Sequence, residues 1–252
     1  MSGLFSLAGR RALVTGGSRG IGAAIAEALA AAGADVAVHG NSRPAEPTCQ
    51  RVRERGRRAL ALAGDLADPR VPEALVRATV EGLGGIDLLV NNAGTIRRGP
   101  SAETSDEDWL AVIEVNLNSV FRTCRAAGSR MLADGRGKIV NVASLLSFQG
   151  GLTVPAYAAA KGGVAQLTKA LANEWAGRGV NVNAIAPGYV RTDNTAALQE
   201  DPTRSRQILE RIPAGRWAEA SDIAGAVLFL CSHAADYIHG VILPVDGGWL
   251  AR

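Results

Sequence analysis

The chain of 252 residues is long enough for one large hydrophobic core, and its 47% of hydrophobic residues argues against a disordered protein. The net charge is only +3, and the densest basic run, Arg51 to Arg58, is interrupted by Glu54 and lacks aromatic residues, so nucleic-acid binding is not expected. No apolar run reaches the ~20 residues that span a membrane. The three cysteines form no CxxC pair, so we expect a cytoplasmic protein with reduced thiols and no metal site.

Short apolar runs alternate with longer segments of helical periodicity. The runs are four to six residues long and nearly continuous, which is typical of strands covered on both faces. The expected strands span residues 12–15, 35–38, 59–62, 86–90, 138–142, 180–185 and 241–245. The clearest helical patterns span residues 21–32, 71–83, 109–132, 156–176 and 222–231.

Strand–helix alternation implies right-handed βαβ crossovers and therefore a parallel sheet. We predict a single α/β domain over residues 1–252: a Rossmann-like, doubly wound parallel sheet of about seven strands with helices on both faces. Thr104 and Glu107 have the spacing of a capping box before the helix at 109–132. The least regular stretch, 191–216, carries Pro202 and Pro213 and is predicted to form a partly helical lid or binding loop.

A glycine-rich turn links the first expected strand to the first expected helix. It reads Thr15-Gly16-Gly17-Ser18-Arg19-Gly20-Ile21-Gly22. Gly16 permits a tight turn, Gly20 lets the backbone approach a pyrophosphate, and Gly22 permits close helix packing. Unpaired N–H groups at a helix start attract phosphate, so the turn indicates a dinucleotide site.

Three polar residues near the fifth expected strand and the following helix point to proton transfer. Tyr157 and Lys161 are four residues apart and therefore share one helix face. A lysine ammonium ~4 Å away supplies ~4 kcal/mol at an effective dielectric of ~20, enough to lower a tyrosine pKa of ~10 toward neutrality. Ser144 ends a strand, where its hydroxyl could polarise a carbonyl. Asn116 lies inside an apolar helical stretch and needs polar partners there.

These fragments, in their order along the whole chain, resemble the short-chain dehydrogenase/reductase family. The resemblance is carried by the Gly-x-x-x-Gly-x-Gly spacing, Asp65-Leu66, Asn91-Asn92-Ala93-Gly94, Ser144 with Tyr157 and Lys161, Pro187-Gly188 with Thr192, and Asp246-Gly247-Gly248. It implies an NAD(P)-dependent oxidoreductase acting on CH–OH groups. Its implied catalytic tetrad is Asn116, Ser144, Tyr157 and Lys161: Tyr157 exchanges the proton, Ser144 stabilises the oxyanion, Lys161 holds the nicotinamide ribose, and Asn116 holds a proton-relaying water.

The resemblance also implies the residues that contact the cofactor. They are Gly16, Ser18, Arg19, Gly20, Ile21, Gly22, Asn41, Ser42, Arg43, Asp65, Leu66, Asn92, Ala93, Gly94, Tyr157, Lys161, Pro187, Gly188, Val190 and Thr192. In NAD-preferring relatives an Asp closes the second strand and binds the ribose 2′-hydroxyl. Gly40 stands at that position here, with Arg19 and Arg43 nearby, so we expect NADP(H) to be favoured, with NAD(H) as the alternative.

Several longer stretches resemble the branch of the family that acts on sugar acids. They span residues 91–98, 144–151, 186–189, 211–217 and 245–252. An acidic substrate needs a cation for its carboxylate, and arginine suits that role. The candidate substrate residues past strand ends and around the lid are Arg97, Arg98, Gln149, Arg191, Asn194 and Arg216.

Two other functions are compatible with the same motifs. A 3-oxoacyl-carrier-protein reductase would be expected to carry an arginine within Leu-Ala-Arg-Glu, where this chain has Leu171-Ala172-Asn173-Glu174. A non-catalytic nucleotide-binding regulator usually loses the tyrosine or the lysine, and this chain keeps both. The resemblance further implies a homotetramer built on the helices at 109–132 and 156–176, and we expect the C-terminal Trp249-Leu250 to be exposed in a monomer.

Overall fold

Parallel strands form one sheet in the order β3-β2-β1-β4-β5-β6-β7 in the computed structural model, which describes residues 3–252 apart from the Asn194 side chain. The strands are β1 (Arg11–Thr15), β2 (Asp35–Gly40), β3 (Ala59–Ala63), β4 (Leu88–Asn91), β5 (Gly137–Val142), β6 (Val180–Pro187) and β7 (Ile242–Val245). The chain winds outward from β1 through β2 and β3, then returns and continues from β4 to β7. The predicted doubly wound parallel sheet is therefore confirmed.

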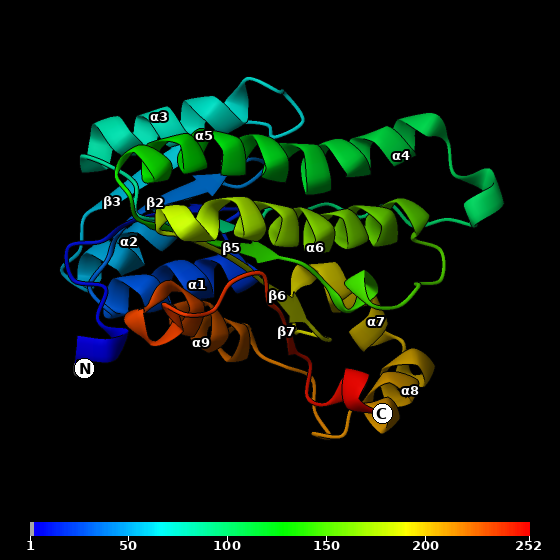
Figure 1. Ribbon diagram of the computed structural model, residues 1–252. Helices are drawn as coiled ribbons and strands as arrows, with labels where there is room; N and C mark the ends of the chain where they lie inside the picture. The colour runs from blue at the N-terminus through cyan, green and yellow to red at the C-terminus, as the bar shows by residue number, and fades with distance from the viewer. Residues whose placement is uncertain (1–2) are drawn as a thin grey trace.

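Helices cover both faces of this sheet (Figure 1). The helices are α1 (Gly20–Ala31), α2 (Glu46–Glu54), α3 (Val71–Leu83), α4 (Asp106–Ile113), α5 (Ser119–Ala133), α6 (Pro155–Trp175), α7 (Ala196–Glu200), α8 (Pro202–Arg211) and α9 (Ala220–Cys231). In Figure 1, α3, α5 and α6 lie on one side of the sheet, and α1 and α9 lie on the other. This three-layer arrangement leaves the carboxyl ends of the strands at one edge, where open α/β sheets bind ligands.

The two faces of the sheet each build a hydrophobic cluster. Successive strand residues point to opposite faces, so Leu13 packs with Met131 of α5 while Val14 packs with Ile25 of α1. All of these side chains are fully buried. Burial of each large aliphatic side chain contributes ~1.5–3 kcal/mol, so the sheet is a rigid base for whatever its edge carries.

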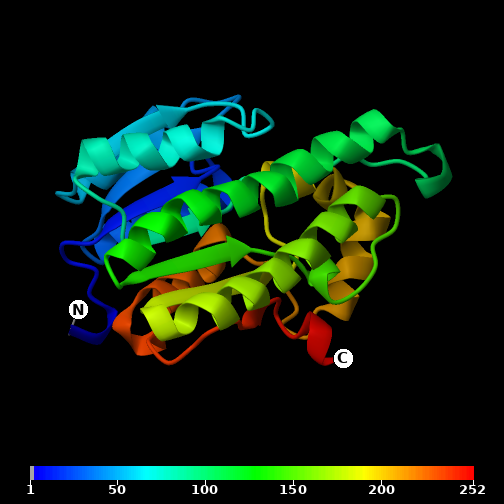
Figure 2. The same ribbon diagram turned by 45° about the horizontal axis from the view of Figure 1, so that its top comes forward.

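The helix expected at 109–132 is interrupted. A π-helical turn, Glu114–Asn118 (η3), joins α4 to α5, and Figure 2 shows the two helices as one continuous column. The expected capping box at Thr104 is wrong by one residue: Ser105 is the N-cap, and its hydroxyl accepts a hydrogen bond from Asp108 N at 3.1 Å. Inserted π turns are frequent at functional sites.

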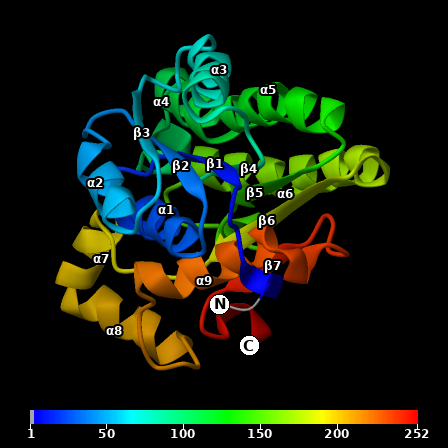
Figure 3. The same cartoon turned by 90° about the vertical axis from the view of Figure 1, so that its left-hand side faces the viewer.

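Residues 191–216 contain a 3-10 turn, Asp193–Thr195 (η6), followed by α7 and α8. Figure 3 shows α7 and α8 together beside the body of the molecule, with the C-terminus near α8. A third apolar cluster lies beneath α8; its buried members are Leu145, Ile208, Ile212, Trp217 and Trp249. Trp249 is 5% exposed, and its ring lies 4.8 Å from that of Tyr189. The expectation that the C-terminal tryptophan is exposed in a monomer is therefore wrong, because its own chain covers it.

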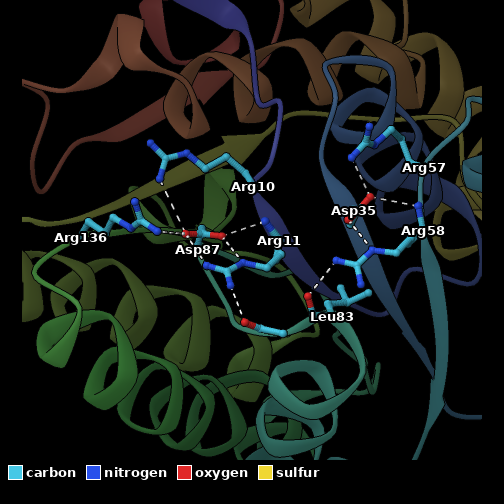
Figure 4. A network of polar contacts seen from close by, with 9 residues as sticks. Arg10, Arg11, Asp35, Arg57, Arg58, Leu83, Asp87 and Arg136 are labelled. Carbon is cyan, nitrogen blue, oxygen red and sulfur yellow. Dashed lines mark hydrogen bonds and ion pairs between the residues drawn. The ribbon is translucent and has the colours of Figure 1, made fainter.

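The opposite edge of the sheet is held by arginine–carboxylate pairs (Figure 4). Arg11 binds the buried Asp87 through Nε and Nη2 at 2.7 and 3.1 Å, and Arg58 binds Asp35 at 2.8 Å. Burial raises the pKa of Asp87, but the hydrogen bonds from Arg11 outweigh it and hold the pKa below its usual range. A hollow of about 410 Å³ at this edge, lined in part by Arg10 and Asp87, contains none of the predicted site residues.

Within residues 3–252, no helix is both long and apolar enough to cross a bilayer.

Candidate active site

Tyr157 and Lys161 project from the first turns of α6. Pro155 begins this helix, and its ring is compatible with the first helical turn because no hydrogen bond is lost there. Lys161 is 4% exposed, and its Nζ donates a hydrogen bond to the Val142 carbonyl oxygen at the end of β5 at 2.6 Å. The same Nζ lies 5.6 Å from the centre of the Tyr157 ring. The end of β5 and the start of α6 therefore bring the predicted acid/base and its cation together.

Ser144 follows β5 and faces Tyr157 from the strand side. Its backbone is extended, and its Oγ accepts a hydrogen bond from Leu146 N at 3.2 Å, which starts a 3-10 turn. The Ser144 hydroxyl also lowers the pKa of Tyr157, so the two side chains face the same space. A carbonyl oxygen placed between these two hydroxyls would meet two donors, which is the arrangement that stabilises a developing oxyanion.

The protonation of this pair differs from the sequence-based expectation. Burial raises the pKa of Tyr157, and the Ser144 hydroxyl and the charge of Arg98 offset only part of that rise. Burial also lowers the pKa of Lys161 to about 8. The prediction that the lysine lowers the tyrosine pKa is therefore wrong for this structure, because the ammonium is directed at the Val142 carbonyl and desolvation dominates both groups. Tyr157 is a protonated phenol at neutral pH, which is the form that donates a proton.

Asn116 lies in the π-helical turn and is fully buried. Its Oδ1 accepts from Thr95 N and its Nδ2 donates to Thr95 O, both at 2.8 Å. A Cβ placed on Gly94 would lie 3.2 Å from Asn116 Oδ1 and 4.0 Å from Lys161 Nζ. The segment after β4 is thus tied to the turn between α4 and α5 beside the lysine, so two of the four predicted tetrad residues, Asn116 and Lys161, lie next to Gly94.

The glycine-rich turn has the shape expected for a phosphate cradle. Gly16 has φ +63°, and a Cβ there would lie 2.7 Å from Ala93 Cα. A Cβ on Gly22 would overlap with the carbonyl oxygen of Gly16. Arg19 is the N-cap residue of α1 and provides no side-chain cap, so backbone N–H groups at this helix start point toward the open edge. These features fit the pyrophosphate of a dinucleotide cofactor.

Asn92 braces this turn from the neighbouring strand. Its Nδ2 donates to Thr15 O at 3.1 Å and Gly16 O at 2.9 Å. In return, Thr15 Oγ1 accepts from the backbone N–H groups of Asn92 and Ala93, each at 3.1 Å. The structure therefore gives Asn92 the role of shaping the turn between β1 and β4.

His39 lies beside the glycine-rich turn, and the sequence analysis did not identify it as part of the site. It is buried in β2, where Nδ1 accepts from Gly16 N at 3.3 Å and Nε2 donates to Gly64 O at 2.9 Å. Burial lowers its pKa, which keeps the ring neutral and able to accept one bond while donating the other. His39 thus links the glycine-rich turn to the segment that carries Asp65. No sequence signal distinguishes this from an ordinary core histidine.

The loop after β2 closes over Gly40. A Cβ on Gly40 would overlap with the carbonyl oxygen of Arg43 and lie 3.2 Å from Ser18 Cβ. This close contact turns Arg43 back toward Arg19, and both guanidinium groups pair with the same carboxylate oxygen of Asp193 at 3.2 Å. Asn41 and Ser42 are exposed in the same loop.

The remaining predicted cofactor residues lie at the same edge of the sheet. Asp65 is exposed after β3 and accepts from Ala67 N at 2.9 Å, while Leu66 is buried. Pro187 ends β6, and a Cβ on Gly188 would lie 2.7 Å from Asp246 Cα. The others on this edge are Ile21 in the first turn of α1, Val190 in an isolated bridge with Ala218, and Thr192, the N-cap of η6.

The candidate substrate residues divide into two groups. Arg97 pairs with Asp108 at 3.4 Å, Arg191 with Glu219 at 3.3 Å, and Arg216 with Asp222 at 2.6 Å. Gln149 accepts from Trp249 Nε1 at 3.3 Å. Arg98 forms no ion pair among the described side chains, and its charge acts on Tyr157. The side chain of Asn194 lies outside the described part of the chain.

Known proteins resemble this chain over nearly its full length. The sequence profile of a family described as enoyl-(acyl carrier protein) reductase matches residues 16–250. The 2-dehydro-3-deoxy-D-gluconate 5-dehydrogenase of Bacillus subtilis (strain 168) is 51% identical, with 98% of this chain and 97% of the relative covered. A crystal structure from Agrobacterium tumefaciens, described as a 2-deoxy-D-gluconate 3-dehydrogenase with bound NADP, is 56% identical and has a TM-score of 0.92. The match covers 98% of this chain and 99% of that chain. Gluconate 5-dehydrogenase from Burkholderia cenocepacia, in complex with NADP and tartrate, is 39% identical with a TM-score of 0.93 and 98% of each chain covered.

Proposed function

Because the chain belongs to the short-chain dehydrogenase/reductase family of NAD(P)-dependent oxidoreductases, we propose that it interconverts a hydroxyl and a ketone on a six-carbon keto- or deoxy-aldonic acid, with NADP(H) favoured over NAD(H). The observation that carries this proposal is the convergence of Tyr157, Lys161 and Ser144 beside Arg98, whose charge acts on Tyr157. A proton donor, an oxyanion donor and a cation for the substrate carboxylate support a reaction of this kind.

The side chains divide the proton chemistry between them. In reduction, the Tyr157 hydroxyl donates its proton to the substrate carbonyl oxygen while the Ser144 hydroxyl hydrogen-bonds the same oxygen. In oxidation, the phenolate form of Tyr157, which has first lost its own proton, takes the alcohol proton. The Lys161 ammonium, which is mostly protonated at pH 7, donates to the Val142 carbonyl and holds the end of β5 beside the first turns of α6. The nicotinamide, when bound, accepts or supplies the hydride.

The preference for NADP(H) rests on the loop after β2. An Asp in place of Gly40 would hydrogen-bond the ribose 2′-hydroxyl, but its side chain has no room because the Arg43 carbonyl occupies that space. Arg19 and Arg43 instead present two guanidinium groups to one carboxylate oxygen, a geometry that also suits a phosphate. The Agrobacterium tumefaciens and Burkholderia cenocepacia structures contain NADP, which supports this choice.

The sugar-acid substrate rests on Arg98 and on the names of the relatives. The Bacillus subtilis relative is a 2-dehydro-3-deoxy-D-gluconate 5-dehydrogenase, and the Burkholderia cenocepacia structure holds tartrate, a dicarboxylate. A desolvated substrate carboxylate requires a cationic partner. Arg98 meets this need better than Arg97, Arg191 or Arg216, which are each paired with an acidic side chain.

The experiment compares two adjacent arginines on charged and neutral substrates. Arg98→Ala should raise the KM for a keto-aldonic acid by about tenfold or more, because an arginine–carboxylate hydrogen bond contributes ~1.5–3 kcal/mol. The KM for a neutral polyol analogue should change little. Arg97→Ala is the matched control, since Arg97 is exposed and paired with Asp108. If Arg98→Ala affects charged and neutral substrates equally, Arg98 does not bind the carboxylate.

We further propose a homotetramer in the cytoplasm, with residues 191–216 acting as a lid over the substrate. The apolar Trp109, Leu110 and Phe121 are exposed on α4 and α5, which supports contact with another copy of the chain there. The three cysteines are unpaired and buried, which is compatible with a reducing compartment. Light scattering tests the assembly: a monomer mass at working concentration contradicts it.

A further inference from the structure

The carboxylate that pairs with Arg19 and Arg43 belongs to the segment at 191–216. Asp193 Oδ2 lies 3.2 Å from Arg19 Nη1 and 3.2 Å from Arg43 Nη2. Arg19 comes from the turn after β1 and Arg43 from the loop after β2, whereas Asp193 begins η6 after β6. Three segments far apart in the sequence thus meet at one carboxylate oxygen.

Local structure holds Asp193 at this place. The turn Asp193–Thr195 is closed by a reciprocal capping box between Thr192 and Thr195, in which Thr195 Oγ1 accepts from Thr192 N at 3.2 Å. The preceding residue packs on the glycine-rich turn, because a Cβ on Gly20 would lie 3.5 Å from Thr192 Cγ2. The backbone of η6 therefore starts against the phosphate cradle, and the Asp193 side chain points at the arginine pair.

Two guanidinium groups that converge on one oxygen need an anion between them, since their mutual repulsion is otherwise uncompensated. The backbone of Arg43 is held in place, because its carbonyl packs on Gly40. The three side chains are 42%, 59% and 57% exposed for Arg19, Arg43 and Asp193, so their ion pairs are weak and exchange readily with another anion. A phosphate dianion carries more charge than a carboxylate and can accept from both arginines at once.

We propose that Asp193 is a specificity-determining residue for the cofactor: its carboxylate occupies the position of the ribose 2′-phosphate, and a 2′-phosphorylated cofactor must displace it. This proposal rests on the proposed NADP(H) preference. Displacement transfers Arg19 and Arg43 from Asp193 to the phosphate and releases η6, α7 and α8 from the cofactor loops. A cofactor without the 2′-phosphate leaves the Asp193 pairs in place, so only the phosphorylated cofactor uncouples the segment at 191–216.

The first test measures binding of two nicotinamide-free ligands by calorimetry, adenosine 2′,5′-bisphosphate and 5′-AMP, to the full chain. Asp193→Asn keeps the side-chain shape and removes the competing charge. It should tighten binding of the bisphosphate by roughly tenfold, the effect of two exposed ion pairs, and leave 5′-AMP binding unchanged. Glu200→Gln, an exposed carboxylate of α7, is the control for the change in net charge and should alter neither affinity.

The results separate the two proposals. If wild-type protein binds the bisphosphate no tighter than 5′-AMP, the arginines do not hold a 2′-phosphate. Both the proposed preference for NADP(H) and the proposed role of Asp193 are then wrong. If wild-type protein prefers the bisphosphate but Asp193→Asn does not strengthen that preference, the proposed role of Asp193 is wrong and the proposed preference for NADP(H) stands.

The second test follows trypsin cleavage at exposed arginines of α8, such as Arg204. The bisphosphate should speed cleavage of wild-type protein severalfold, whereas 5′-AMP should not. Asp193→Asn should be cleaved rapidly with either ligand or none. Protection of α8 by the bisphosphate would overturn the proposed displacement. Thermal denaturation of both variants checks that they are folded.

Discussion

The side-chain amide of Asn116 pairs with both backbone polar groups of Thr95, accepting from its N–H and donating to its carbonyl at 2.8 Å each. The pairing joins the π-helical turn between α4 and α5 to the segment that follows β4. Because Gly94 lies against both Asn116 and Lys161, this one contact sets the position of the backbone beside Lys161.

Asn116→Ala should destabilise the protein by about 1–3 kcal/mol, because it leaves two polar groups of Thr95 without partners near a buried position. Thermal denaturation measures the loss. Asn118→Ala, on the same π-helical turn but bonded only to Glu114, is the control and should cost less. Equal costs for the two variants would show that the pairing with Thr95 has no special importance.

The buried Lys161 should make stability depend on pH in the alkaline range. Its pKa falls from 10.5 to about 8 on folding, so between these values the unfolded chain holds a proton that the folded chain has released. The free energy of unfolding should therefore rise as the pH increases through this window, by at most about 3 kcal/mol. Below about pH 8 both states are protonated and this contribution is constant.

Denaturant unfolding of wild type and Lys161→Met across this pH range checks the effect. The difference between their unfolding free energies should grow with pH from about 8 to 10.5. Lys169→Met changes an exposed lysine of the same helix and should give a flat difference. A flat difference for Lys161→Met as well would mean that burial does not depress the pKa of this lysine.

Gly40 should resist the substitution that confers NAD preference in relatives. Gly40→Asp forces a Cβ against the Arg43 carbonyl, so it should lower the Tm and displace the loop that carries Arg43. NADP affinity should fall more than NAD affinity. Gly40→Ala introduces the Cβ without the charge and should show the same loss of stability, which separates crowding from repulsion. A Gly40→Asp protein with wild-type Tm and stronger NAD binding would contradict the crowded geometry.

Thr153 is, among the described residues, the non-glycine residue with positive φ, at +61°. A β-branched side chain is unfavourable there, whereas asparagine tolerates the left-handed region. Thr153→Asn should therefore raise stability by about 1 kcal/mol, measured by thermal denaturation, with Thr153→Val as the β-branched control that should not. Because Thr153 O accepts from Gly99 N at 3.0 Å, this loop also joins the segment after β4 to the start of α6. A lower Tm for Thr153→Asn would show that the threonine conformation is not strained.

Local spacing predicted most of the fold and which residues share the helix face of the candidate site. Alternating apolar runs and helical segments are short-range patterns, so they specify the strands and the doubly wound sheet. The four-residue spacing of Tyr157 and Lys161 likewise predicts that both lie on one helix face. The π-helical turn around Asn116 was not predicted, because one inserted residue barely changes the apolar periodicity of the surrounding helix.

Long-range partners account for what the sequence did not reveal. Arg191 and Arg216 are candidate substrate residues by position, but their acidic partners Glu219 and Asp222 become visible only in the folded chain. The pKa of Tyr157 depends on burial and on where the Lys161 ammonium points, neither of which spacing determines. Trp249 is covered by α8 and Tyr189, a contact between the C-terminus and distant segments.

Turnover of sugar acids, followed by the absorbance of the reduced nicotinamide, tests the proposed reaction most directly. A panel of aldonic and keto-aldonic acids, with a 3-oxoacyl thioester as the competing substrate, is assayed with NADP(H) and NAD(H) on wild type and Tyr157→Phe. We expect at least one sugar acid to be converted, with a higher kcat/KM for NADP(H) than for NAD(H). In Tyr157→Phe, turnover should fall by at least ~10²-fold while cofactor binding is retained. Reduction of the thioester but of no sugar acid, or near wild-type turnover in Tyr157→Phe, would contradict the proposed function.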